Sequence, residues 1–222
     1  MTLAVPRMNR LPATERGLTL GDFLVPIRVG ERLSSTARHT ALVIAGAIVV
    51  ALAAQVSIQL PGTPVPITGQ TFGVLLVGGA LGFRRGGLAL LLYLVAGFVL
   101  PVYANHGSGV ATLVASPNGG VVFGPTGGYL VGFVLAAAIV GRLAELGWDR
   151  KLPGSLAALL VGNVLVYVVG VPWLAVATGS DLASAVGQGL APFVLTDALK
   201  LLLAAGLFPA AWWVVGRSPG ER

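Results

Sequence analysis

The chain contains no cysteine and few charged residues, and both absences narrow its function. Without Cys, disulfide bonds, thiolate nucleophiles and Cys-ligated metals are excluded. Asp, Glu, Lys and Arg make up only 10% of the 222 residues, whereas apolar residues make up 55%. Neither the dipeptide Gly-Lys nor the pattern His-Glu-x-x-His occurs. The sequence therefore lacks a P-loop for nucleotides and the zinc-hydrolase motif.

Long apolar segments, separated by glycine, proline and charge, make up most of the chain. Its mean hydropathy is +0.88, and its 32 glycines are typical of membrane helices that pack closely. We therefore predict an all-α integral membrane protein, a bundle of six transmembrane helices. The predicted spans cover residues 40–58, 70–83, 88–104, 124–146, 155–177 and 191–215.

The distribution of basic residues predicts the topology. Of the 14 Lys and Arg residues, six precede the first span, two separate spans two and three, and three fall at the junction of spans four and five. Two more follow the last span, and Lys200 lies within it. The remaining three connections contain none. Because basic residues accumulate on the cytoplasmic side, we place both termini there. The net charge of +6 is then a topology signal rather than a sign of nucleic-acid binding.

These signals divide the chain into three parts. Residues 1–36 are interpreted as a cytoplasmic, arginine-containing leader, residues 37–217 as the membrane-embedded substrate-binding domain, and residues 218–222 as a cytoplasmic tail. Within the leader, Leu18 to Ile27 either lie on the membrane surface or form a flexible tail; we favour the tail.

The last span carries a pair of ionisable residues, Asp197 and Lys200. Charged side chains at membrane depth cost about 2.5–3.5 kcal/mol each on insertion scales. Their spacing places them on one helical face, where each partly neutralises the other. A functional site is one explanation for their retention, and a structural ion pair is the other.

Two connections on the outer side contain unusual turn sequences. Pro64–Gln70 leads into a span too short to cross a bilayer, and Gly124–Tyr129 opens the fourth span. Irregular backbone at membrane depth is tolerated where it is buried or lines a cavity. We therefore predict short, re-entrant-like loops on the same side as Asp197 and Lys200. The alternative is an ordinary helix start with proline in its first turn.

Four ordered motifs resemble the BioY family, the biotin-binding S components of energy-coupling factor (ECF) transporters. They are PVPITGQTFGVLLVGGALGFRRG, LLYLVAGFVLPVYA, GPTGGYLVGF and APFVLTDALKLLLAA. The resemblance covers roughly residues 40–215 and implies six helices with a substrate cavity near the outer surface. It also implies a transmembrane coupling subunit and two cytoplasmic ATPases as partners. Family members dock that subunit through Ala-x-x-x-Ala patterns in the first helix, which Ala41/Ala45 and Ala47/Ala51 both match.

The resemblance implies high-affinity biotin capture and uptake, energised by the partner ATPases, with biotin as the transported substrate and no cofactor or bound metal. The ureido ring of biotin offers two N–H donors and a carbonyl, and its valerate tail ends in a carboxylate. Asp197 is suited to accept from the ureido N–H groups and Lys200 to donate to either oxygen group. The other candidate substrate-binding residues are Thr68, Gln70, Tyr93, Thr126, Gly127, Tyr129, Asn163, Tyr167 and Trp173.

Other functional classes fit the sequence less well. An intramembrane enzyme would need a nucleophile–base pair or a metal cluster, and His39 and His106 are separated by the predicted topology. A channel usually needs polar residues along the whole pore, whereas polarity here is confined to one side. We therefore predict no enzymatic activity. An S component for a different vitamin is the main alternative, and a structural membrane protein is a weaker one.

Overall fold

The computed structural model describes residues 18–24, 34–109, 114–115 and 122–216. Long helices form the body of the molecule, and two short antiparallel strand pairs, β1–β2 and β3–β4, lie at one end. The helices are α1 (Gly21–Leu24), α3 (Ser35–Gln55), α4 (Gln70–Ala96), α5 (Gly127–Glu145), α6 (Leu152–Thr178), α7 (Leu182–Gly189) and α8 (Val194–Gly216). The strands are β1 (Ser57–Ile58), β2 (Ile67–Thr68), β3 (Val114–Ala115) and β4 (Val122–Phe123).

Helix α4 is a hairpin of two helical halves. Gly82, with φ 85° and ψ 179°, interrupts it in a backbone region open to glycine. A Cβ atom built on Gly86 would lie 3.0 Å from the Cα of Gly78, although eight residues of straight helix span about 12 Å. The chain therefore folds back at Gly82, and the two halves are the predicted second and third spans. Our boundary at residues 84–87 was wrong, because those residues already belong to the second half.

The six-helix bundle predicted from the sequence is confirmed. Five segments are long and apolar enough to cross a membrane by length and composition, one of them combining α7 with α8. Because α4 folds back, they supply six spans of a multi-pass protein of the cell membrane. The third span ends at Ala96, not near residue 104 as predicted; an irregular segment with a short 3₁₀ helix, Ala104–His106, follows it.

Close approach of helix backbones explains the abundant glycine. A Cβ atom on Gly78 would lie 2.6 Å from the carbonyl oxygen of Ala137, so any side chain there would push α4 and α5 apart. Two clusters of buried residues fill the rest of the interior; one contains Tyr129 and Phe133, and the other contains Leu159 and Phe208. The bundle thus combines small residues at helix crossings with larger apolar side chains between them.

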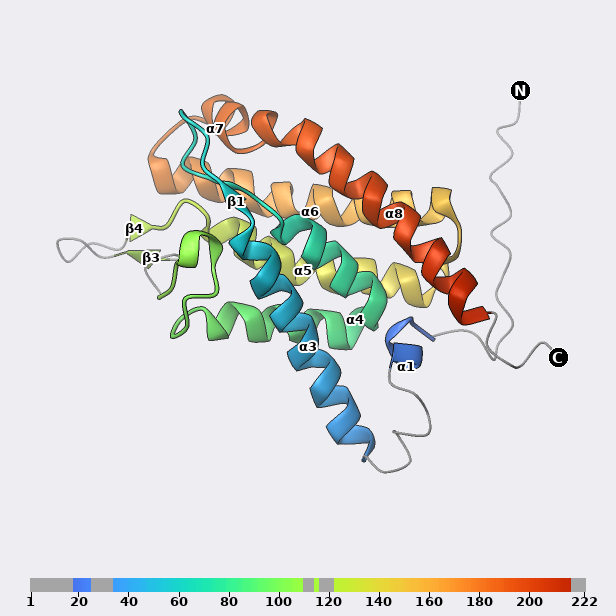
Figure 1. Cartoon of the computed structure of the whole chain (residues 1–222). Coiled ribbons are helices and arrows are strands. Elements are labelled where there is room, and N and C mark those ends of the chain that lie inside the picture. The colour runs from blue at the N-terminus through green and yellow to red at the C-terminus, as the bar shows by residue number, and fades with distance from the viewer. Residues whose placement is uncertain (1–17, 25–33, 110–113, 116–121, 217–222) are drawn as a thin grey trace, which may run out of the picture.

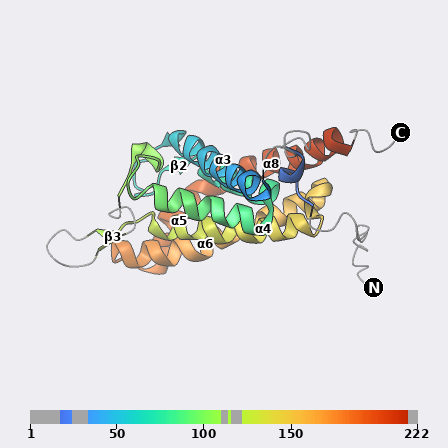
Figure 2. The same cartoon turned by 90° about the horizontal axis from the view of Figure 1, so that it is seen from below.

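The two ends of the bundle differ in what covers them. In Figures 1 and 2 the strands lie at one end, and the short helix α1, in blue, lies at the other. The end with α1 also holds the turn of α4 with its two arginines, so it is the cytoplasmic end by the positive-inside rule. The end with the strands is therefore the outer end.

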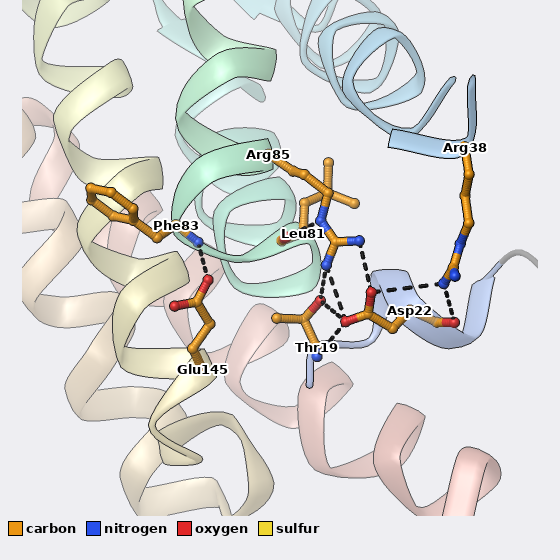
Figure 3. Close-up of polar contacts among 7 residues, drawn as sticks. All are labelled: Thr19, Asp22, Arg38, Leu81, Phe83, Arg85 and Glu145. Carbon is orange, nitrogen blue, oxygen red and sulfur yellow. Dashed lines mark hydrogen bonds and ion pairs between the residues drawn. The ribbon is translucent and has the colours of Figure 1, made fainter. Parts of the chain in front are cut away.

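The described part of the leader packs against the cytoplasmic end of the bundle. Leu20 is buried among residues of α4, α6 and α8, and Phe23 meets the ring of Trp212 edge-on at 5.7 Å. Asp22 forms an ion pair with Arg85 at 2.8 Å, and Arg38 also contacts Asp22 (Figure 3). For residues 18–24 the flexible tail that we favoured was therefore wrong, because these residues are held by packing and by an ion pair. Residues 25–27 of that predicted segment lie outside the described residues.

Candidate functional site

A cavity of about 330 Å³ opens at the outer end of the bundle. Its walls come from the β1–β2 connection, the start of α4, the segment after α4, and helices α5, α6 and α8. Six of the residues predicted from the sequence line it: Thr68, Gln70, Thr126, Tyr129, Tyr167 and Lys200. The re-entrant-like loop was also correctly predicted, because Val65 and Gln70 are only 7% and 5% exposed.

Asp197 holds two side chains of this site in place. Its carboxylate accepts a hydrogen bond from the Tyr167 hydroxyl at 2.6 Å and another from the Lys200 ammonium at 2.9 Å. Asp197 itself is only 3% exposed and does not line the cavity, whereas Lys200 does. The ammonium group keeps further N–H donors for a ligand. In this pair Lys200 faces the cavity, and Asp197 holds the Lys200 ammonium group in place from behind.

A second polar group lies where α4 begins. The Gln70 amide donates to the Tyr93 hydroxyl at 2.7 Å and accepts from the Thr68 hydroxyl at 3.0 Å. Tyr93 in turn donates to the carbonyl of Val102 at 3.2 Å. Tyr93 is buried behind Gln70 and does not line the cavity. This chain of hydrogen bonds fixes the amide plane of Gln70, which is a requirement for selective ligand recognition.

Aromatic side chains anchor the loops around the cavity. Tyr129 donates to the carbonyl of Gly189 at 2.8 Å and meets Tyr167 edge-on at 6.2 Å. The indole N–H of Trp173 donates to the carbonyl of Gly124 at 2.9 Å. A Cβ atom on Gly127 would lie 2.9 Å from the Trp173 ring. Gly127 and Trp173 therefore support the Gly124–Thr126 wall without lining the cavity themselves.

Asn163 is a further predicted residue that does not line the cavity. It is 8% exposed, and its side-chain oxygen has no hydrogen-bond partner among the described residues. It lies on α6, one helical turn before Tyr167. Its polarity pointed to the correct helix, but its place in the packing could not be inferred from the spans alone.

Several residues that line the cavity were missed. The apolar and aromatic wall residues come from the segment after α4, from α5 and α6, and from the turn before α8; they include Tyr103, Leu130, Phe133, Val166 and Phe193. Asn105 also lines the cavity and has a φ of 56°, a left-handed conformation that Asn tolerates better than most residues. Asn105 could have been found from the sequence, because it is a polar residue beside an apolar segment. The apolar wall residues could not, because they resemble any core residue.

The arrangement suits a small, partly polar ligand. Pockets for small molecules are mostly apolar, with a few fixed polar groups, and start near about 300 Å³. Here a cationic donor, Lys200, and a fixed amide, Gln70, share the cavity with the hydroxyl groups of Tyr167, Thr68 and Thr126. A ligand with both an apolar ring and several hydrogen-bonding atoms would match these groups.

The predicted docking surface on α3 is resolved into two different faces. Ala41 and Ala45 are exposed. Ala47 is 8% exposed and belongs to the buried cluster that contains Tyr129 and Phe133, and Ala51 packs against that cluster. Ala47/Ala51 therefore serve helix packing inside the bundle. Only Ala41/Ala45 remain available to a partner.

Comparisons with known proteins agree with this fold. The model of the BioY family matches residues 28–217. A biotin transporter BioY of Thermotoga maritima is 38% identical over 75% of this chain and 86% of its own length. A biotin transporter BioY of Rhizobium etli is 34% identical over 72% of this chain and 84% of its own length. The crystal structure of an S component for biotin from an ECF-type ABC transporter superimposes with a TM-score of 0.69 at 22% identity, covering 80% of this chain and 93% of that one.

Proposed function

The chain belongs to the BioY family, and we propose that it captures biotin at the outer face of the cell membrane as the substrate-specific subunit of an ECF-type transporter. The observation that carries the proposal is the outer cavity, in which Lys200, Gln70 and Tyr167 face a largely apolar space. Relatives named for biotin transport match most of the chain. The proposal therefore has a site of suitable chemistry and a family in which that chemistry is used.

The ureido ring of biotin fits the Lys200 end of the cavity. The ammonium group donates to the ureido oxygen, and Asp197 keeps it oriented through the 2.9 Å bond. Asp197 does not line the cavity, so it acts on the ligand by holding the Lys200 ammonium group and the Tyr167 hydroxyl in place. The apolar bicycle packs between Tyr129, Phe133 and Tyr167. Gln70 supplies an amide for the remaining polar atoms.

Movement across the membrane requires partners on this proposal. The chain has no P-loop, so the energy comes from two cytoplasmic ATPases joined through a transmembrane coupling subunit. The exposed Ala41/Ala45 face of α3 lets a partner helix approach closely, as small residues do in membrane interfaces. A leucine at either position should weaken co-purification with the coupling subunit, whereas Ala210→Leu on an exposed face of α8 should not.

Calorimetry with the purified full-length protein in detergent tests the ligand. We expect stoichiometric biotin binding, no binding of thiamine or riboflavin, and a loss of affinity of at least tenfold in Lys200→Gln, because a charge-assisted hydrogen bond contributes about 1.5–3 kcal/mol. Lys151→Gln is the matched control, because it removes an exposed charge that precedes the first residue of α6, at the cytoplasmic end of the bundle. Binding of another vitamin in place of biotin would overturn the assignment of the ligand.

A further inference from the structure

A second cavity, a groove of about 1010 Å³, lies at the cytoplasmic end of the bundle. It is bordered by the start of α3, the turn and second half of α4, and the end of α5. None of the residues that line the outer cavity lines this groove. Biotin capture does not account for it.

The groove exists because α3 diverges from α4. The two helices touch near Gly46, where an added Cβ atom would lie 2.9 Å from that of Ala89. Towards its start, α3 extends beyond the neighbouring helices (Figure 1), and nearly all of its residues before Leu42 are exposed. The space between the diverging helices is the groove.

One face of α4 combines a positive charge with apolar side chains. Arg84, Leu88, Leu91 and Val95 follow one another at helical spacing and all line the groove. The three apolar side chains are 53%, 46% and 51% exposed. Arg84 lies at the cytoplasmic end of this row, so the face is polar at the membrane surface and apolar further in. An amphiphilic lipid has the same order of groups.

The positive charge at the cytoplasmic end of the groove is only partly compensated. Arg85, the neighbour of Arg84, is occupied by Asp22, Thr19 and the carbonyl of Leu81 (Figure 3). Arg84 is exposed and forms no hydrogen bond or ion pair with any residue that the structure describes.

The end of α5 adds a second arginine to this rim. Arg142 pairs with Glu145 at 3.0 Å, yet its side chain remains 59% exposed. The other carboxylate oxygen of Glu145 accepts from the backbone N–H of Phe83 at 2.9 Å. Both oxygens of Glu145 are thus engaged, and the rim keeps an excess of positive charge that an anion can balance.

We propose that this groove binds an anionic phospholipid of the cytoplasmic leaflet. The phosphate lies between Arg84 and Arg142, where guanidinium groups donate paired hydrogen bonds to its oxygens. One acyl chain lies along Leu88, Leu91 and Val95, and the exposed His39 on α3 is within the same rim. Basic pockets between transmembrane helices on this side suit anionic headgroups. A zwitterionic choline headgroup would bring a cation towards the arginines and bind more weakly.

Native mass spectrometry of the delipidated full-length protein tests the proposal. The protein is titrated with phosphatidylglycerol and, separately, with phosphatidylcholine of the same acyl chains. We expect preferential retention of phosphatidylglycerol, weakened about fivefold in Arg84→Gln and further in Arg84→Gln/Arg142→Gln, since each basic residue near the surface contributes about 1 kcal/mol. Lys151→Gln, a cytoplasmic charge outside the groove, should leave lipid retention unchanged. Retained biotin binding in each variant shows that it is folded.

Three results would overturn the proposal. The first is equal retention of both lipids by the wild-type protein, and the second is unchanged phosphatidylglycerol binding in the double variant. The third concerns the occupant: a photo-crosslinker at position 88 that reacts in membranes with the coupling subunit and not with lipid would make the groove a protein interface. Glycerol 1-phosphate should not displace the lipid, because Leu88, Leu91 and Val95 contribute to binding. Displacement would show that the site binds a phosphate group alone.

Discussion

The two ends of the bundle each contain an ion pair between a carboxylate and a basic residue of α4 or α8, but their surroundings differ. At the outer end, Lys200 contacts Asp197 and also faces a cavity. At the cytoplasmic end, Arg85 contacts Asp22, Thr19 and the carbonyl of Leu81, and residues 18–24 cover it. Lys200 has donors left for a ligand, whereas most donors of Arg85 already have partners in the chain.

This difference separates a binding pair from a structural one. The two ion pairs have nearly the same length, 2.9 Å and 2.8 Å. The length of an ion pair therefore does not show whether it belongs to a binding site. Both basic residues line a cavity. What distinguishes them is that Lys200 has unused donors, whereas Arg85 donates to Asp22, Thr19 and the carbonyl of Leu81. The comparison therefore predicts that equivalent substitutions at the two ends will have different effects.

The largest contrast should come from replacing either aspartate by asparagine. Asp197→Asn removes the negative charge that orients the Lys200 ammonium group, so biotin affinity should fall by at least tenfold, in line with about 1.5–3 kcal/mol for a charge-assisted hydrogen bond. Asp22→Asn should leave biotin affinity within about twofold and lower the melting temperature in detergent. Calorimetry and thermal unfolding measure both. Equal losses of biotin affinity in the two variants would remove the distinction between the ends.

A second prediction concerns Asp149, a buried carboxyl group at the cytoplasmic end. Burial raises its pKa to about 6, although Trp212 donates to it at 2.6 Å. The folded protein therefore holds this proton more tightly than the unfolded chain, and its contribution to stability is greatest below pH 4 and is lost as the pH rises towards 6. The loss is about 3 kcal/mol, at about 1.4 kcal/mol for each pKa unit.

The Asp149→Asn variant isolates this effect. Its amide oxygen still accepts from Trp212 but does not ionise, so its melting temperature relative to wild type should increase by several degrees between pH 4 and pH 7. The Asp22 pKa is lowered, although burial opposes the hydrogen bonds from Arg85 and Thr19. Stability from Asp22 is therefore lost only as the pH falls below about 4, and the two windows do not overlap. A pH-independent difference between variant and wild type would contradict the assignment.

A third prediction tests the docking of residues 18–24. Leu20→Ala removes a side chain that is 8% exposed and packs against the cluster around Phe208, and it should cost about 2 kcal/mol. Leu18→Ala, at a position that is 36% exposed, is the matched control and should cost far less. Biotin affinity should be unchanged in both variants. Thermal unfolding with equal melting temperatures for the two variants would show that this segment contributes little.

The smallest effect is expected from Tyr167→Phe at the outer end. The substitution removes the 2.6 Å hydrogen bond to Asp197 and keeps the aromatic wall, so biotin affinity should fall about fivefold, in line with about 1 kcal/mol for one hydrogen bond. Tyr103→Phe, which removes a hydroxyl that donates to the Leu94 carbonyl on another part of the wall, should change affinity less. Titration calorimetry on both variants ranks the two sides of the cavity.

The spans, the topology and the shared face of Asp197 and Lys200 could be predicted from the sequence, because each depends on residues that are close together in the chain. Apolar length gave the six spans, the positions of Lys and Arg gave the topology, and a spacing of three placed Asp197 and Lys200 on one face. No packing information was needed for any of them. The Gln70 end of the site was predicted for the same reason, because its loop is marked by local prolines.

Features that depend on contacts between distant segments could be known only from the packed helices. The turn at Gly82, rather than at the arginines that follow it, depends on how closely α4 can approach α5. The pairing of Asp22 with Arg85, 63 residues apart, and the burial of Asp197 behind Lys200 depend on which helix faces meet. Hydropathy and charge report whether a residue prefers lipid, protein or water. They do not report which partner it will find, because that is settled only when the helices pack.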